Sequence, residues 1–127
     1  MTVDPKPNIP IPTEHQEQVA LFRWAAYKPE LRWMHAIPNG GKRTIGVARK
    51  LKAEGVTPGI PDIFCPFPRP GYSGLYIELK RTKGSSTSPD QKEAIAYLES
   101  QGYAVAVCKG WEAASLIITK YMGWERP

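Results

Sequence analysis

Two short segments, residues 59–62 and 77–80, constrain the fold of this chain most strongly. The first reads Gly-Ile-Pro-Asp and precedes an apolar run, whereas the second reads Ile-Glu-Leu-Lys and ends one. Side chains two residues apart in a strand point to the same face, so Glu78 and Lys80 lie together. We therefore predict two antiparallel strands, residues 62–65 and 74–80, that bring Asp62 close to this pair.

The rest of the chain alternates helices with strands, which predicts an α/β fold. Capping-box patterns begin predicted helices at Thr13 and Ser88. Four prolines in residues 1–12 predict an extended arm, and residues 13–127 are expected to form a single domain. We expect helices over residues 13–27, 43–54, 88–101 and 111–122, an extended segment over 31–37 and a buried strand over the apolar run 103–108.

The composition limits the class of partner and the compartment. Lys and Arg outnumber Asp and Glu by 17 to 12, which favours an anionic partner such as nucleic acid. No apolar stretch reaches the ~18 residues of a membrane span. The N-terminus also lacks a signal-peptide pattern, so we expect a cytoplasmic protein without a membrane partner. Cys65 and Cys108 lie in apolar runs, which predicts buried free thiols.

Asp62, Glu78 and Lys80 form the first candidate site. Carboxylate oxygens are the ligands that Mg²⁺ prefers, and a bound cation lowers the pKa of an attacking water and polarises a phosphoryl oxygen. Lys80 would orient or deprotonate that water, or neutralise charge that builds on the phosphate. For Glu-x-Lys alone the alternative is a solvated hairpin face, but Asp62 after its turn points to phosphodiester hydrolysis.

Two helices offer further candidates. Glu14 lies on the apolar side of its helix, with Gln18, where an unpaired carboxylate is costly to bury; the alternative is a favourable charge in the first helical turn. Glu17 is its rival, at the edge of the same face. Gln91 has a structural role as the capping-box partner of Ser88, yet it also starts the helix face that reaches Glu78 and Lys80.

A glycine-rich basic turn is a candidate phosphate contact. The nucleotide-binding loop would need Gly at position 36 and Ser or Thr at position 43, but the chain has Ala36 and Arg43, so no nucleotide cofactor is expected. Backbone amides beside cationic side chains still suit a DNA phosphate. His15 and His35 lack metal-ligand spacing and are read as structural or surface residues. The predicted DNA contacts are Asn39, Gly40, Gly41, Lys42 and Arg43, with Arg81 and Lys83 in the following basic loop.

These segments together resemble the VRR-NUC (virus-type replication-repair nuclease) domain of the PD-(D/E)xK nuclease superfamily. The resemblance rests on Gly-Ile-Pro-Asp, Ile-Glu-Leu-Lys and Ser-Pro-Asp-Gln-Lys in this order. The segments Thr-Glu-His-Gln-Glu-Gln-Val, Ile-Pro-Asn-Gly-Gly-Lys-Arg and Gln-Gly-Tyr-Ala-Val-Ala-Val-Cys also resemble small stand-alone phage members. The match spans roughly residues 13–122.

The resemblance implies a restriction-endonuclease-like core of the order αβββαβ with flanking helices. It implies that Asp62, Glu78 and the backbone carbonyl of Leu79 bind Mg²⁺ or Mn²⁺, with Glu14 as the helix-one acidic residue. Lys80 becomes the catalytic lysine and Gln91 the glutamine of the motif. Stand-alone members resemble homodimers that cut branched DNA such as four-way (Holliday) junctions, whereas fused members act on flaps.

The leading hypothesis is therefore a metal-dependent, structure-selective DNA endonuclease from a phage or prophage, acting in the bacterial cytoplasm. The chain shows no fused domain, and four Trp and six Tyr exceed the needs of its core, so a homodimer is expected. The alternatives are a non-catalytic basic DNA-binding module of the same fold, and a flap- or restriction-type endonuclease.

Overall fold

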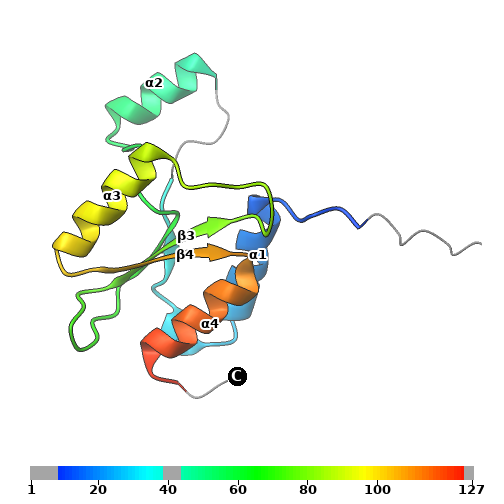
Figure 1. The fold of residues 1–127 in the computed structure, drawn as a ribbon, viewed down its shortest axis with the longest axis vertical. Helices are drawn as coiled ribbons and strands as arrows, with labels where there is room; N and C mark the ends of the chain where they lie inside the picture. The colour runs from blue at the N-terminus through cyan, green and yellow to red at the C-terminus, as the bar shows by residue number, and fades with distance from the viewer. Residues whose placement is uncertain (1–8, 39–43, 125–127) are drawn as a thin grey trace, which may run out of the picture.

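The structure is a computed structural model of the chain, and it describes residues 9–38 and 44–124. A four-stranded sheet runs in the spatial order β1-β2-β3-β4, and helices pack around it (Figure 1). The strands are β1 (His35–Ala36), β2 (Ile63–Cys65), β3 (Leu75–Lys80) and β4 (Ala104–Lys109). The helices are α1 (Glu14–Ala25), the 3-10 helix η1 (Pro29–Leu31), α2 (Ile45–Ala53), α3 (Pro89–Ser100) and α4 (Trp111–Met122).

The predicted α/β fold is confirmed, including the antiparallel pair at its centre. Ile63 of β2 lies opposite Ile77 of β3, and Cys65 lies opposite Leu75. The strand β1 adds an antiparallel edge, and α3 crosses over so that β4 runs parallel to β3. The αβββαβ order is present, with α2 between β1 and β2. Both predicted capping boxes form, at Thr13 and at Ser88.

The two faces of β3 have different surroundings. Leu75, Ile77 and Leu79 are buried in the core, where α1 and α4 pack against each other and against the sheet (Figure 1). A fully buried Leu or Ile contributes about 1.5–3 kcal/mol to folding, so this face anchors the strand. The alternate residues Glu78 and Lys80 point to the other face, which the beginning of α3 approaches. The fold thus fixes two charged side chains on a rigid strand.

Two expectations about strands were wrong in extent. The predicted extended segment 31–37 contains only two strand residues, because η1 ends at Leu31 and a turn at residues 32–33 follows it. The strand β4 was expected to be buried, but it lies at the edge of the sheet and Val107 is 44% exposed. It contacts α3 and α4, but within the described residues it has only one neighbouring strand, β3. Cys65 and Cys108 are buried free thiols as predicted, and burial raises their pKa to about 12 and about 11.

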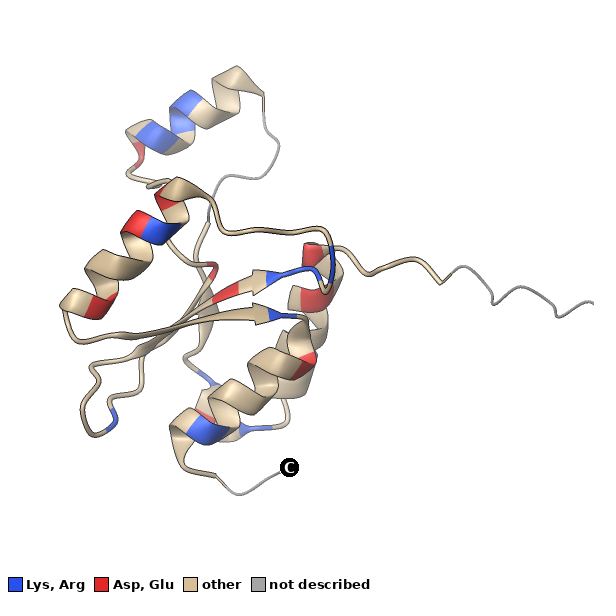
Figure 2. Ribbon diagram, in the orientation of Figure 1, with Lys and Arg blue, Asp and Glu red and all other residues tan. Residues whose placement is uncertain are grey.

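The helix α2 projects from one end of the molecule and carries several basic side chains (Figure 2). None of its residues is buried. Thr44 caps its first turn, since its hydroxyl accepts a hydrogen bond from the Val47 amide at 3.3 Å. Within residues 9–38 and 44–124, no helix has the length and apolar character needed to cross a membrane.

Candidate active site

A cavity of about 850 Å³ lies where β3 ends, and it contains most of the predicted site. Its floor is made by Asp62, Glu78 and Lys80. The first turns of α1 and α3 form two walls, and α2 forms a third. Residues far apart in the sequence thus converge on one concavity, which is the usual form of a catalytic or ligand site.

Asp62 lies just before β2, across from Glu78 when the Ile63–Ile77 register is extended by one residue. Its carboxylate accepts a hydrogen bond from the Leu79 amide at 2.8 Å. In an antiparallel ladder, the N–H and C=O of one residue point to the same edge. The carbonyl of Leu79 therefore faces the Asp62 side of β3, as the proposed ligand set requires.

Gly59 explains how the turn before Asp62 reaches the cavity. Its φ is +85°, and a β-carbon at this position would collide with the backbone carbonyl of Asp90 in α3. Only glycine adopts this conformation readily and permits such an approach. The turn therefore packs on the beginning of α3 and holds Asp62 beside Gln91.

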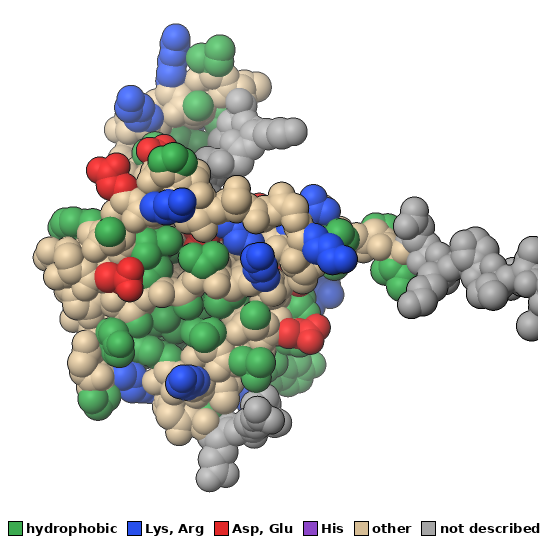
Figure 3. Space-filling view, in the orientation of Figure 1, with side chains coloured by type: hydrophobic (Ala, Val, Ile, Leu, Met, Phe, Trp, Pro, Cys, Tyr) green, Lys and Arg blue, Asp and Glu red, His purple; other side chains and the backbone are tan. Residues whose placement is uncertain are grey.

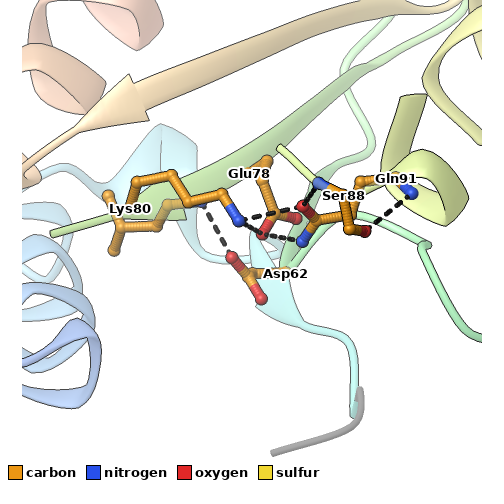
Figure 4. A network of polar contacts seen from close by, with 6 residues as sticks. Asp62, Glu78, Lys80, Ser88 and Gln91 are labelled. Carbon is orange, nitrogen blue, oxygen red and sulfur yellow. Dashed lines mark hydrogen bonds and ion pairs between the residues drawn. The ribbon is translucent and has the colours of Figure 1, made fainter. Parts of the chain in front are cut away.

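Gln91 joins the two charged residues of β3 (Figure 4). Its Nε2 donates to Glu78 Oε1 at 2.9 Å, and its Oε1 accepts from Lys80 Nζ at 2.9 Å. The same oxygen accepts from the Ser88 amide at 2.9 Å, which completes the capping box. Both predicted roles of Gln91 are thus combined, because one side chain caps α3 and clamps the strand residues.

Glu78 is held in a costly environment. The side chain is buried, and Lys80 Nζ lies 3.5 Å from its Oε1. Burial, followed by the negative charge of Asp62, raises the pKa of Glu78 to about 8, although Lys80 opposes this shift. Its buried Oε2 accepts no hydrogen bond from a donor in the described part of the chain, and a side-chain hydrogen bond with Asp62 contributes to the raised pKa. An acceptor oxygen buried in this way is expensive unless a further ligand satisfies it.

The donor set fits a small divalent cation. Asp62 and Glu78 supply carboxylate oxygens, and the Leu79 carbonyl supplies a neutral one. Mg²⁺ is commonly bound by one or two carboxylates and keeps several waters. Among the described residues, no three His, Cys, Asp or Glu side chains are grouped closely enough to form a complete protein cage. Glu14 lines the same cavity but remains exposed, so its metal contact stays a prediction.

The rival carboxylate in α1 has a different position. Glu17, which was expected at the edge of the apolar face, is 5% exposed. Its Oε1 accepts a hydrogen bond from the Trp111 amide at 3.2 Å, at the beginning of α4. Gly110 precedes that helix and offers no side-chain cap. Glu17 therefore caps α4 from another helix, and Glu14 is the carboxylate that lines the cavity.

The structure describes only two of the seven predicted DNA contacts, Arg81 and Lys83. Residues 39–43 lie outside the described residues. The guanidinium of Arg81 approaches the backbone carbonyl of Ile11 at 3.5 Å, and Lys83 is exposed. His15, which was read as a structural or surface residue, is exposed, but sequence reasoning missed that it lines the cavity together with Glu14. Its place directly after Glu14 in the first turn of α1 was the available signal.

The chain is similar to a known protein family and to a solved structure. Residues 12–112 match the family model of the VRR-NUC domain. A solved structure described as a VRR_NUC domain protein aligns with a TM-score of 0.78 and 30% sequence identity. The alignment covers 90% of this chain and 91% of that chain. No curated protein matches the chain.

Proposed function

The chain belongs to the VRR-NUC family of nuclease-type domains, and from this premise we propose that it is a Mg²⁺- or Mn²⁺-dependent endonuclease acting on DNA. The observation that carries the proposal is the cluster of Asp62, Glu78, Lys80 and Gln91 in one cavity, with a buried carboxylate oxygen that accepts no hydrogen bond from a donor among the described residues. Such a site suits phosphodiester hydrolysis, since it combines hard oxygen ligands with a positioned cationic donor.

Each residue has a distinct part in this reaction. Asp62, Glu78 and the Leu79 carbonyl would hold the cation, with Glu14 on the open side of the cavity. When bound, the cation supplies Lewis-acid polarisation of the phosphate and lowers the pKa of a coordinated water. Lys80, held by Gln91 and Glu78, donates hydrogen bonds to the attacking water or to a phosphate oxygen. Gln91 fixes the distance between carboxylate and ammonium, because it bonds to both.

The proposed substrate is branched DNA such as a four-way junction, cut by a homodimer. The net charge of +5 supports binding to phosphate backbones, which carry no sequence information. Hydrophobic side chains gather between α3 and α4, over the edge strand β4 (Figure 3). An uncovered edge strand with apolar neighbours is a surface that a second copy of the chain can cover.

A substrate panel tests the proposal. Purified protein is incubated with four-way junctions, flaps and linear duplex in Mg²⁺, Mn²⁺ or Ca²⁺. We expect cleavage of branched DNA in Mg²⁺ or Mn²⁺, and we expect Asp62→Ala and Glu78→Ala to lose it. Undiminished cleavage by either variant would refute the assignment. Binding without cleavage in any metal would instead identify a non-catalytic DNA-binding module.

A further inference from the structure

The helix α2 forms one wall of the cavity, yet it lacks the packing that normally stabilises a helix. Ala48, Leu51 and Lys52 line the cavity, but no residue of α2 is buried and Ile45 is 72% exposed. Helices shorter than about 12–15 residues are marginal in water without tertiary contacts, and α2 has 9 residues. A partner that covers α2 would therefore supply stabilisation beyond that given by the described residues of the chain.

The charge of α2 identifies the class of partner. Arg49, Lys50 and Lys52 are all exposed, and the helix contains no acidic residue. Cations in the last turn also interact favourably with the helix dipole. That small effect does not explain why the charged helix borders the cavity.

The floor of the cavity is acidic, so an anionic substrate needs cationic side chains nearby to bind there. Asp62 and Glu78 form the floor, and Glu14 and Asp90 lie on the walls of α1 and α3. These carboxylates repel a phosphate that approaches from solvent, whereas fixed cations beside them attract it. Of the described α2 cations, Lys52 lines the cavity itself, so the helix and the floor form one continuous surface.

We propose that α2 is a DNA-binding arm, whose Lys52, at the cavity, and Arg49, on the neighbouring side of the helix, contact the phosphates that flank the scissile bond. The inference rests on the proposed function, because it takes the cavity to hold a phosphodiester. It goes further because it assigns the binding of the DNA backbone on either side of the scissile bond to α2, which is separate from the catalytic residues on the cavity floor. It also follows that α2 becomes more rigid when DNA covers it.

Removing these two charges tests the assignment. The double variant Arg49→Gln, Lys52→Gln alters only exposed side chains, so the fold should be preserved. A control double variant, Arg23→Gln, Arg32→Gln, removes the same charge from exposed positions that do not line the cavity. Binding of a fluorescent four-way junction and of a linear duplex is measured in Ca²⁺ over a range of salt concentrations.

We expect the α2 variant to bind both DNAs more weakly and with a shallower salt dependence. Each phosphate contact that is lost should reduce the slope of log K against log salt by roughly 0.9. The control variant should keep a slope close to that of the wild type. Equal slopes for the two variants would overturn the proposal, as would unchanged binding by the α2 variant.

Hydrogen exchange gives a second readout. Amides of residues 45–53 should exchange rapidly in the free protein and slow down when the junction is added. Protection in the free protein that matches α1, without change on DNA binding, would also overturn the proposal. The catalytic assignment is separable, because it predicts that Glu78→Ala abolishes cleavage while the α2 variant still cleaves when DNA is saturating.

Discussion

At the scale of single residues, Glu78 makes the unliganded protein sensitive to pH. Its pKa is near 4.5 when exposed and about 8 in the folded protein, chiefly because of burial. The folded state therefore retains the proton longer than the unfolded state. The neutral form of Glu78 therefore contributes its full stabilisation below pH 4.5, the pKa of the exposed group. This stabilisation is lost as the pH rises to about 8, the pKa in the folded protein. We expect unfolding in EDTA to become easier between pH 5 and pH 8, by on the order of 3 kcal/mol from this group.

Urea denaturation of the wild type and of Glu78→Gln isolates this effect. The variant cannot ionise at this position, so its stability should decrease less over the same pH range. Mg²⁺ should stabilise the wild type at pH 8, since a ligand that binds only the folded state shifts the equilibrium towards it. It should have a much smaller effect on Glu78→Gln. Parallel pH profiles for the two proteins would contradict the burial argument.

Gln91 permits a separation of helix capping from site geometry. Gln91→Ala removes a capping contact and also the bonds to Glu78 and Lys80. Ser88→Ala removes the reciprocal capping bond, which the backbone N–H of Gln91 donates to the Ser88 hydroxyl. It leaves the side-chain bonds of Gln91 to Glu78 and Lys80 in place. We expect both variants to lose about 1 kcal/mol or more of stability. Only Gln91→Ala should reduce kcat severely, by roughly 10–100-fold, because the donor that it positions would be misplaced. Equal kcat values for the two variants would show that the bonds of Gln91 to Glu78 and Lys80 do not position the site.

The residues of β3 were predictable from sequence because a strand has only two faces. Alternation alone places Glu78 and Lys80 together and opposite to Leu79. The assignment of Glu14 and Glu17 was harder, since both lie near the boundary of the apolar face of α1. Their environments depend on where α4 begins, and a glycine at position 110 left that helix end open for Glu17. No local pattern in α1 reports this tertiary contact.

At the scale of elements, the contact between the Gly59 turn and α3 should be essential. Gly59→Ala places a methyl group against the Asp90 carbonyl and also strains a residue with positive φ. Gly55 is a matched control, because its φ is +93° but a β-carbon added there would meet no described atom within 4 Å. Gly55→Ala should cost only the conformational strain, about 1–3 kcal/mol. Gly59→Ala should cost clearly more in chemical denaturation, and equal losses would mean that the turn does not pack on α3.

Most elements follow from local signals in the sequence. The capping boxes mark the beginnings of α1 and α3, and the glycines after α3 and α4 mark their ends. The exposure of β4 could not be predicted in the same way. A continuous apolar run is typical of a strand covered on both faces, but it does not reveal whether a second neighbouring strand exists. In this fold, β4 is the last strand of the sheet.

At the scale of the whole molecule, that uncovered edge supports the predicted homodimer. Ile117 of α4 is 36% exposed and Val107 of β4 is 44% exposed, whereas most large apolar residues of the core are buried. A cavity of about 500 Å³ is lined by Ile117 and by residues 104–106 of β4. Pairing of two such surfaces would cover both edge strands. It would also hold two catalytic cavities in one particle, as paired incision of a branched substrate requires.

The variant Ile117→Glu tests this assembly, because Ile117 lines that cavity and a charge at an apolar interface resists burial. Light scattering at micromolar concentration should give about twice the 14.2 kDa chain mass for the wild type and a value near the chain mass for the variant. Tyr27→Glu is the control, since Tyr27 is 86% exposed and lies outside this surface. The monomeric variant should still nick branched DNA, because each cavity is made within one chain, but it should lose paired incisions. A wild-type protein that is monomeric at this concentration would rule out the homodimer and, with it, paired cleavage by a preassembled enzyme.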